Sequence, residues 1–317
     1  MTKALLLRMH DELPFSTREL ASLIATAQYR YKVYQIPKRR PNEFRTIAQP
    51  SAEIKIIQRW LIQSVLGKLP LHKAATAYRE GKSIADHAAI HADRRFLLKV
   101  DFSDFFPSIT AEDVRRHLLR YGKMPTEDIE AITKLVCWRN RATGRLCLSI
   151  GAPSSPALSN SLLYDFDKAV AKLLTGKRVR YSRYADDLAF STNAPNTLSD
   201  IYTGLGQVCA ELPYPRLKIN TAKTVFTSKA HRRVLVGMVL TPDGEISLGR
   251  ERKRRLRSAL YRFSNGNSEP SEVATLRGEL AFAWSVERAF VLSLVRQRGA
   301  DVFEALGLPF SKSADDS

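Results

Sequence analysis

The sequence predicts an α+β protein in which strands carry acidic side chains and helices separate them. Two observations support this fold class. The chain has 317 residues, of which 44% are hydrophobic, enough for a large core and two or three subdomains. Short apolar runs that reach an aspartate alternate with segments of helical periodicity. This order favours a palm-like sheet flanked by helices over an all-helical protein.

The N-terminal part predicts two helices with a hairpin between them. Residues 16–34 have helical spacing, and Ser16 can cap the helix. Residues 34–50 predict a hairpin whose turn is marked by Pro41 and Asn42. Residues 51–69 return to helical spacing.

The central part predicts a buried strand, a helix and a second pair of strands. The run from 95 to 106 begins as a strand that ends at Pro107 and Ser108, and Thr110 caps the helix that follows. Residues 179–191 predict a strand-turn-strand unit, and residues 198–212 predict a helix.

The C-terminal part predicts two more strands and a basic helical region. The strands cover 216–227 and 232–240, and a turn follows at 242–244. From residue 249 the chain is helical and at first very basic. The tail SKSADDS is expected to fray.

The charge balance indicates a polyanionic partner. Fifty Lys and Arg stand against 32 Asp and Glu, a formal net charge of +18, so nucleic acid is the default partner. An anionic membrane surface could also attract the chain. However, no apolar run approaches the roughly 20 residues that span a bilayer, and the start MTKALLLRMH is too short for a signal-peptide core. Cys137, Cys147 and Cys209 lack metal-type spacing and indicate reduced thiols in a cytoplasmic protein.

Three aspartates stand in apolar, strand-like surroundings. Asp186 and Asp187 lie inside RYADDLAFS, and Asp101 ends the apolar run of LLKVDFSDFF. Burial of such charges is costly unless something pairs them. A hairpin turn at Asp186 and Asp187 would let the carboxylates converge. A lone Asp-Asp pair is usually a solvated turn, and Asp104 better fits a capping role. The combination of three acids with a charge of +18 favours a phosphoryl-transfer site that uses two divalent ions about 4 Å apart.

Four motifs occur in the order of the reverse-transcriptase motifs: DFSDFF, GAPSSPALSN, YADD and LKINTAKT. From about residue 20 to residue 300 the chain closely resembles bacterial retron reverse transcriptases. The resemblance implies a right-hand polymerase fold whose palm is an antiparallel sheet that carries the aspartates. It implies fingers in residues 1–95, a palm with inserted fingers helices in 96–240, and a small helical thumb with the tail in 241–317.

The resemblance also assigns roles to residues of the site. Asp101, Asp186 and Asp187 would hold two Mg²⁺ ions, for which Mn²⁺ can substitute, and Lys223 would protonate the departing pyrophosphate. The positions expected to bind the incoming nucleotide are Arg45 on the triphosphate, Phe106 as a wall against a ribose 2′-OH, and the segment Gly151, Ala152 and Pro153.

One departure from the family pattern precedes the GAPSSPALSN motif. The family commonly has Leu-Pro-Gln-Gly there, and this chain has Leu148-Ser149-Ile150-Gly151. Ile150 cannot donate the hydrogen bond that Gln offers to the nucleotide. We therefore expect another group to replace that bond or a lower affinity for nucleotides. Ser154 or Ser155 is expected to cap the next helix.

Two segments typical of retron reverse transcriptases match the family pattern only in part. In the Asn-Ala-x-x-His segment this chain has His87-Ala88-Ala89-Ile90-His91, and in the Val-Thr-Gly segment it has Leu235-Val236-Gly237. A histidine such as His91 is otherwise most often a hydrogen-bonded surface or core residue. The basic run 250–263 predicts a thumb helix that grips structured RNA. The residues expected to bind RNA are His91, Arg252, Arg254 and Arg255.

The resemblance implies that the enzyme copies part of a cognate structured non-coding RNA into DNA. Synthesis would start from an RNA 2′-OH and give branched multicopy single-stranded DNA (msDNA). Deoxynucleotides would be the substrates, and a separate effector protein would join the complex in anti-phage defence. Two alternatives stay open. One is a reverse transcriptase of the group II intron or diversity-generating type, and the other is a non-catalytic RNA-binding scaffold with a polymerase fold.

Overall fold

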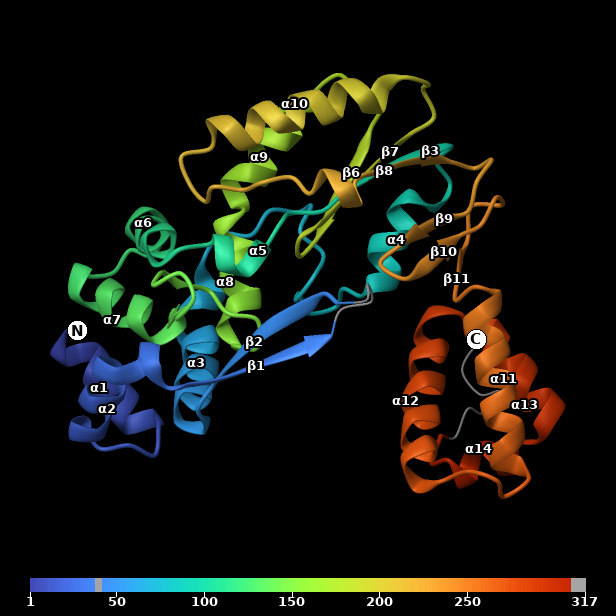
Figure 1. Cartoon of the computed structure of the whole chain (residues 1–317), viewed down its shortest axis with the longest axis horizontal. Coiled ribbons are helices and arrows are strands. Elements are labelled where there is room, and N and C mark those ends of the chain that lie inside the picture. Colours follow the sequence, from blue (N-terminus) through green and yellow to red (C-terminus); the bar gives the residue numbers. More distant parts are fainter. Residues whose placement is uncertain (38–41, 309–317) are drawn as a thin grey trace, which may run out of the picture.

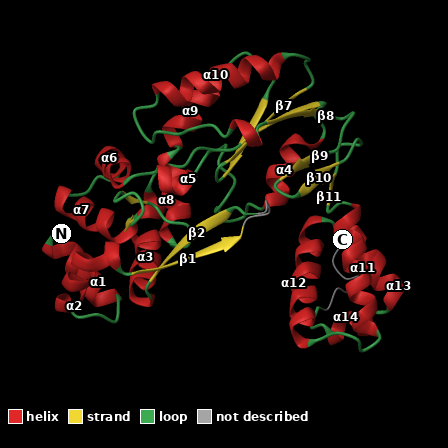
Figure 2. Cartoon of the chain, in the orientation of Figure 1, coloured by secondary structure: helices red, strands yellow, loops and turns green. Residues whose placement is uncertain are grey.

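A four-stranded antiparallel sheet lies at the centre of the computed structural model, which describes residues 1–37 and 42–308 (Figure 1). The strand order in this sheet is β6-β7-β3-β8. Helices α9 and α10 lie over one side of the sheet and α4 lies at the other (Figures 1 and 2). The α+β prediction is therefore confirmed.

The N-terminal part forms helices around one long hairpin. Its elements are α1 (Lys3–Glu12), α2 (Thr17–Thr26), η1 (Ala27–Tyr29), β1 (Tyr31–Pro37), β2 (Phe44–Pro50), α3 (Ala52–Ser64), η2 (Leu66–Lys68) and α4 (Ile84–Ala92). Ser16 caps α2 in a capping box with Glu19, as predicted. The predicted helix 16–34 is wrong beyond residue 29, because Tyr31–Pro37 pairs with Phe44–Pro50 along its whole length.

The central part supplies most of the sheet and the helices that cover it. Its elements are β3 (Phe96–Val100), α5 (Phe105–Ser108), α6 (Ala111–Tyr121), α7 (Thr126–Val136), β4 (Trp138–Arg139), β5 (Leu146–Cys147), α8 (Ser154–Leu162), α9 (Tyr164–Leu173), β6 (Arg180–Tyr184), β7 (Asp187–Thr192) and α10 (Thr197–Glu211). Thr110 caps α6 as predicted. The predicted strand-turn-strand unit is confirmed as β6 and β7.

The C-terminal part completes the sheet and then becomes helical. Its elements are η3 (Thr221–Lys223), β8 (Val225–Ser228), β9 (Arg233–Leu235), β10 (Met238–Leu240), β11 (Ile246–Ser247), α11 (Arg250–Ser264), α12 (Pro270–Val286), α13 (Arg288–Arg298) and α14 (Ala300–Ala305). The predicted strand 216–227 is wrong over most of its length, because the 3-10 turn η3 interrupts it and only β8 pairs with β3. The predicted turn at 242–244 joins β10 to β11.

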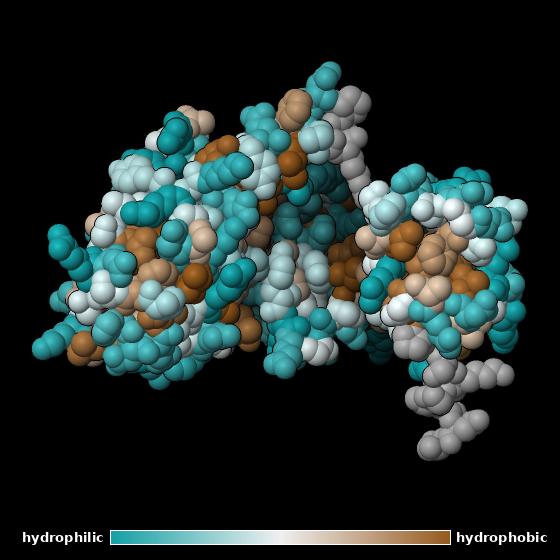
Figure 3. All heavy atoms as spheres, turned by 90° about the horizontal axis from the view of Figure 1, so that it is seen from below, coloured by the Kyte–Doolittle hydropathy of each residue, from teal (hydrophilic) through white to brown (hydrophobic). Residues whose placement is uncertain are grey.

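Two large hydrophobic cores and one small cluster around Trp138 hold the described residues together. The larger core joins the N-terminal helices to one face of the sheet, and the other large core joins α11–α14 to α4 and β9–β10. Figure 3 shows the C-terminal helices as a separate lobe, with a hollow between this lobe and the rest of the molecule. The predicted division into fingers, palm and thumb stays a prediction.

Three further expectations concern the cysteine thiols, membrane-spanning helices, and the hairpin turn and C-terminal tail. Cys137, Cys147 and Cys209 are buried free thiols, as predicted. Among the helices of residues 1–37 and 42–308, none has the length and apolar character that a bilayer crossing needs. Pro41 of the predicted hairpin turn and the tail SKSADDS lie outside the described residues, whereas Asn42 is described and has the positive φ typical of a turn.

Candidate active site

The three predicted aspartates meet at one end of the central sheet. Asp101 directly follows β3, and β3 pairs antiparallel with β7 so that Val100 stands opposite Leu188. Asp187 is the first residue of β7 and therefore lies at the same end of the sheet as Asp101. Asp186 occupies the turn between β6 and β7, next to Ala185 with φ 56°. The β6–β7 hairpin thus carries Asp186 and Asp187, and the long-range pairing of β3 with β7 brings Asp101 to the same end of the sheet.

The carboxylates lie close enough to disfavour one another's ionisation. Burial, and then the charges of Asp186 and Asp101, raise the pKa of Asp187 to about 6. Burial and the charge of Asp101 also raise the pKa of Asp186. The positive charges of Lys223 and Arg45 oppose this shift only in part. The site therefore concentrates negative charge that a bound cation would stabilise.

Their donor atoms suit a hard divalent ion, although the set is not preassembled. All three residues offer carboxylate oxygens, which Mg²⁺ and Mn²⁺ prefer. Across residues 1–37 and 42–308, no group of three or more His, Cys, Asp or Glu is arranged to hold a metal ion. Mg²⁺ is often held by one or two carboxylates together with substrate phosphates, so Asp186 and Asp187 fit such a partial set. A bound ion here would activate the attacking hydroxyl and stabilise the leaving oxygen.

Lys223 faces Asp101. Its Nζ donates to both carboxylate oxygens of Asp101 at 3.0 Å. The segment before it is tied to the same strand end, because Asn220 N donates to Asp101 O at 2.8 Å. Lys223 therefore neutralises Asp101 in this structure. Its expected role as the acid for pyrophosphate stays a prediction, and that role requires Lys223 to leave Asp101.

Metal binding should weaken below about pH 6, because a protonated Asp187 cannot coordinate. The pKa of Asp187 is higher in the fold than its ordinary value of 3.8. Without metal, this carboxyl therefore lowers stability as the pH rises from 3.8 towards 6. The rise in melting temperature caused by Mg²⁺ should be large at about pH 7.5 and small at about pH 5. An equal rise at both values would contradict this assignment.

The expected nucleotide-binding residues other than Phe106 lie on β2 and in the segment that enters α8. Arg45 is exposed on β2, and its charge acts on Asp186. Gly151 lies against that same strand, where Ala48 N donates to Ile150 O at 2.9 Å. Ala152 is buried and Pro153 is half-buried at the start of α8. The hairpin β1–β2 and the segment that enters α8 are therefore joined, and the charge of Arg45 on this hairpin acts on Asp186.

Phe105 and Phe106 divide into a core residue and a half-buried residue. Phe105 is buried and its ring contacts that of Phe102. Phe106 is only partly buried, with its ring centroid 5.2 Å from that of Phe105. This arrangement leaves part of the Phe106 ring available as the expected wall against a 2′-OH. Asp104 takes the N-cap position of α5 with φ 45°, but its side chain makes no capping hydrogen bond.

Gly151 cannot be replaced without strain. Its φ is +117°, and an added Cβ would lie 3.1 Å from Ile47 Cγ2 and 3.2 Å from the Ala48 carbonyl oxygen. We expect Gly151→Ala to destabilise the fold by about 1–3 kcal/mol and to raise the KM for dNTP by moving the strand that carries Arg45. Gly144→Ala is the matched control, because Gly144 also has positive φ but open space around it. Equal dNTP KM values for both variants would contradict the link to β2.

The helix after Gly151 begins differently from the prediction. Pro153 takes the N-cap position in a helical conformation, and no side chain caps α8. Ser154 and Ser155 lie inside the first turn, where neither buried hydroxyl has a partner among the described residues. The expected cap by Ser154 or Ser155 is therefore wrong, because the helix begins one residue earlier than a serine cap requires.

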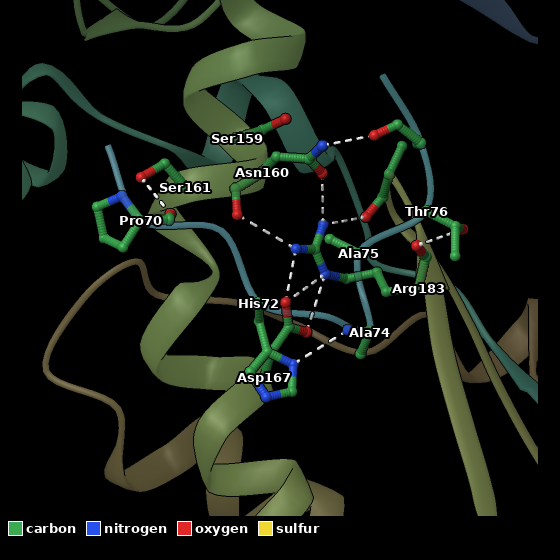
Figure 4. A network of polar contacts seen from close by, with 12 residues as sticks. Pro70, His72, Ala74, Ala75, Thr76, Ser159, Asn160, Ser161, Asp167 and Arg183 are labelled. Carbon is green, nitrogen blue, oxygen red and sulfur yellow. Dashed lines mark hydrogen bonds and ion pairs between the residues drawn. The ribbon is translucent and has the colours of Figure 1, made fainter. Parts of the chain in front are cut away.

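A buried ion pair next to the turn between β6 and β7 was not predicted. The side chains of Arg183 and Asp167 have no solvent exposure, and Arg183 Nη2 donates to Asp167 Oδ2 at 2.7 Å (Figure 4). Arg183 Nη1 donates to Asn160 Oδ1 and to the Ala185 carbonyl, both at 3.1 Å. Tyr181 donates to Asp167 at 2.6 Å. One guanidinium thus fixes the backbone immediately before Asp186.

Family and fold comparisons agree with this geometry. Residues 36–249 match the family described as "Reverse transcriptase (RNA-dependent DNA polymerase)". The chain is 38% identical to "Retron Ec83 reverse transcriptase" of Escherichia coli over 87% of this chain and 89% of that protein. It is 32% identical to "Retron Ec86 reverse transcriptase" of the same organism over 86% and 81% of the two chains. The chain belongs to the retron reverse transcriptases. It is an RNA-directed DNA polymerase, as the motifs predicted.

The fold resembles that of a solved telomerase structure. The telomerase of Candida tropicalis without ligand aligns with a TM-score of 0.51 and 12% identity. The alignment covers 86% of this chain and 58% of the telomerase chain. At this identity the likeness shows the fold alone, and it confirms the predicted right-hand polymerase fold.

His91 is a buried structural residue in this retron reverse transcriptase. Its Nδ1 and Nε2 lie 2.7 Å from Ser191 Oγ and 2.8 Å from Ser182 Oγ, and its ring has no exposed surface. Burial holds its pKa well below the ordinary value, so the ring is neutral. The expected direct contact between His91 and RNA is therefore wrong for this structure. His91 instead joins α4 to β6 and β7.

The expected RNA-binding arginines on α11 differ in exposure. Arg254 and Arg255 are exposed on α11. Arg252 is half-buried, pairs with Glu279 at 3.2 Å and lies 4.2 Å from the ring centroid of Phe282. Glu279 already compensates its charge, and Glu287 compensates that of Lys253. Arg254 and Arg255 thus remain the better placed for a phosphate backbone.

Proposed function

We propose that this enzyme reverse transcribes part of a cognate structured non-coding RNA, starting from a 2′-OH of the same RNA. The product would be msDNA, a branched molecule of RNA and single-stranded DNA. The three carboxylates at the end of β3 and β7 carry this proposal, together with the identity to retron reverse transcriptases. A net charge of +18 supports a tightly held nucleic acid.

We assign roles to the site residues within this proposal. Asp101, Asp186 and Asp187 would hold Mg²⁺, with Mn²⁺ as a substitute. Lys223 would protonate the leaving pyrophosphate. The incoming dNTP would lie against Arg45, Phe106 and the segment 151–153. Because Lys223 pairs with Asp101 at 3.0 Å, metal and substrate would release Lys223 as they bind. Arg254 and Arg255 would contact RNA phosphates.

The wider context of the proposal is anti-phage defence in the cytoplasm. A separate effector protein would join the complex of enzyme, RNA and msDNA. The three free, buried cysteines are consistent with a reducing compartment. This part of the proposal rests on the family resemblance.

The nucleic acid bound to the protein tests the retron assignment. The chain is purified from cells that carry its neighbouring non-coding locus, and the bound nucleic acid is treated with RNase or DNase. We expect a DNase-sensitive species joined to RNA, lost in the double variant Asp186→Asn with Asp187→Asn while RNA stays bound. DNA that is never joined to RNA would favour a group II intron or diversity-generating type. Bound RNA without DNA in either sample would favour the scaffold.

A further inference from the structure

Tyr78 is an exposed aromatic residue beside the catalytic turn. It lies in the loop that leads to α4, and 52% of its surface is exposed. Its φ is +55°, a conformation that bulky residues rarely adopt. Neither the exposed ring nor the positive φ of Tyr78 stabilises the fold, because the ring does not pack in either large hydrophobic core. Strained conformations of this kind concentrate at functional sites.

The loop before Tyr78 is fixed to the catalytic hairpin. Thr76 N donates to Arg183 O and Arg183 N donates to Ala74 O, both at 2.8 Å. Asn160 Nδ2 donates to Ala77 O at 2.6 Å (Figure 4). The backbone next to Tyr78 is therefore held by the same buried network that holds the Ala185 carbonyl. The backbone next to Tyr78 is thus fixed in place, although the ring of Tyr78 is exposed.

The ring of Tyr78 lies next to that of Tyr184. The two centroids are 6.3 Å apart, and the ring of Tyr184 has buried His87 as its other neighbour at 5.7 Å. Tyr184 pairs with Asp187 across the β6–β7 hairpin, so the two rings lie next to the turn that carries Asp186. Burial and then the charge of Asp186 raise the pKa of Tyr78, so its phenol stays protonated at neutral pH. An exposed aromatic face thus stands at the edge of the site where the new bond forms.

We infer that Tyr78 contacts the primer-terminal base pair and stacks its ring against it. This inference rests on the proposed polymerase site. A polymerase meets a different base pair at its primer end after every addition. Stacking on an aromatic ring tolerates every base, because each base has a π face. An exposed ring on a fixed backbone suits a changing primer end better than hydrogen bonds that recognise a single nucleobase.

Kinetics on a preformed primer–template duplex test the inference. Tyr78→Ala should raise the KM for the duplex about 10-fold, the effect of losing one base–aromatic stack, and should leave the KM for dNTP within about two-fold. Tyr78→Phe keeps the ring and should behave like wild type. Tyr78→Gly should show the same loss as Tyr78→Ala with an equal or higher melting temperature, because glycine relieves the positive φ. Tyr29→Ala, at a tyrosine that is 59% exposed, is the control and should change neither KM.

The outcomes separate this inference from the proposed function. Wild-type KM values in both Tyr78→Ala and Tyr78→Gly would overturn the contact with the primer end. A joint loss of melting temperature, kcat and both affinities would also overturn it, because that pattern indicates a structural role. If the wild-type chain extends no primer under any condition, the proposed function fails, and the inference fails with it.

Discussion

Replacing Asp186 and Asp187 by asparagine should abolish DNA synthesis and should make the metal-free protein more stable. We expect at least a ~10³-fold loss of primer extension, because the variant loses the carboxylates that would hold the divalent ions, and those ions would position and neutralise the reacting phosphates. The stability gain follows from the raised pKa of both groups. Burial and then the charges of neighbouring carboxylates disfavour the ionised form of both groups, so negative charge at this turn lowers stability. Asparagine keeps their size without the charge.

Primer extension, RNA affinity and melting temperature in EDTA check this prediction together. Asp104→Asn is the matched control, because Asp104 is exposed, lies three residues from Asp101 and undergoes the same chemical change. It should keep both activity and stability. Extension by the double variant above about a tenth of wild type would contradict the metal-site assignment, because the expected loss is far larger.

Replacing Asp167 by alanine should strongly destabilise the fold. It would leave the buried guanidinium of Arg183 without its counter-ion, since both side chains are fully buried. Removal of one partner from such a pair costs about 3–5 kcal/mol. Denaturant unfolding measures this change. A loss below about 1 kcal/mol, the range of an exposed ion pair, would show that the pair is solvated in solution.

A compensating variant separates stability from positioning. Asp167→Leu combined with Arg183→Met replaces the ion pair with apolar groups, and such replacements are often neutral for stability. The Ala185 carbonyl and Asn160 would still lose their guanidinium donor. We expect stability near that of the wild type with primer extension about 10²-fold lower, because small displacements of catalytic groups are costly. Full activity in this variant would show that the network serves stability alone.

The convergence of Asp186 and Asp187 could be predicted because its determinants are local, whereas the position of Asp101 beside them depends on pairing between distant strands. A strand end and a tight turn need only neighbouring residues, and the antiparallel pairing of β3 with β7 brings Asp101 level with Asp187. The strand after residue 31 could not be separated from the preceding helix in the same way. The pairing of β1 with β2 decides the structure of this segment. Helical spacing of the apolar residues continues up to the start of β1, so the spacing alone does not mark the end of the helix.

The roles of Arg183 and His91 depend on tertiary contacts that the sequence does not display. Arg183 pairs with Asp167 and Asn160, which lie 16 and 23 residues away on other elements. One signal was present, since Asn160 belongs to the GAPSSPALSN motif and Arg183 directly precedes YADD. His91 meets Ser191 across 100 residues, and no local pattern distinguishes such a histidine from one that contacts RNA.

Templated incorporation of dNTP by the purified chain on an RNA template tests the central claim most directly. The three aspartates should support incorporation complementary to the template in Mg²⁺ or Mn²⁺, and EDTA should stop it. If the chain binds the RNA but incorporates no nucleotide with either ion, the polymerase site described here is not functional. The protein would then be an RNA-binding scaffold with a polymerase fold.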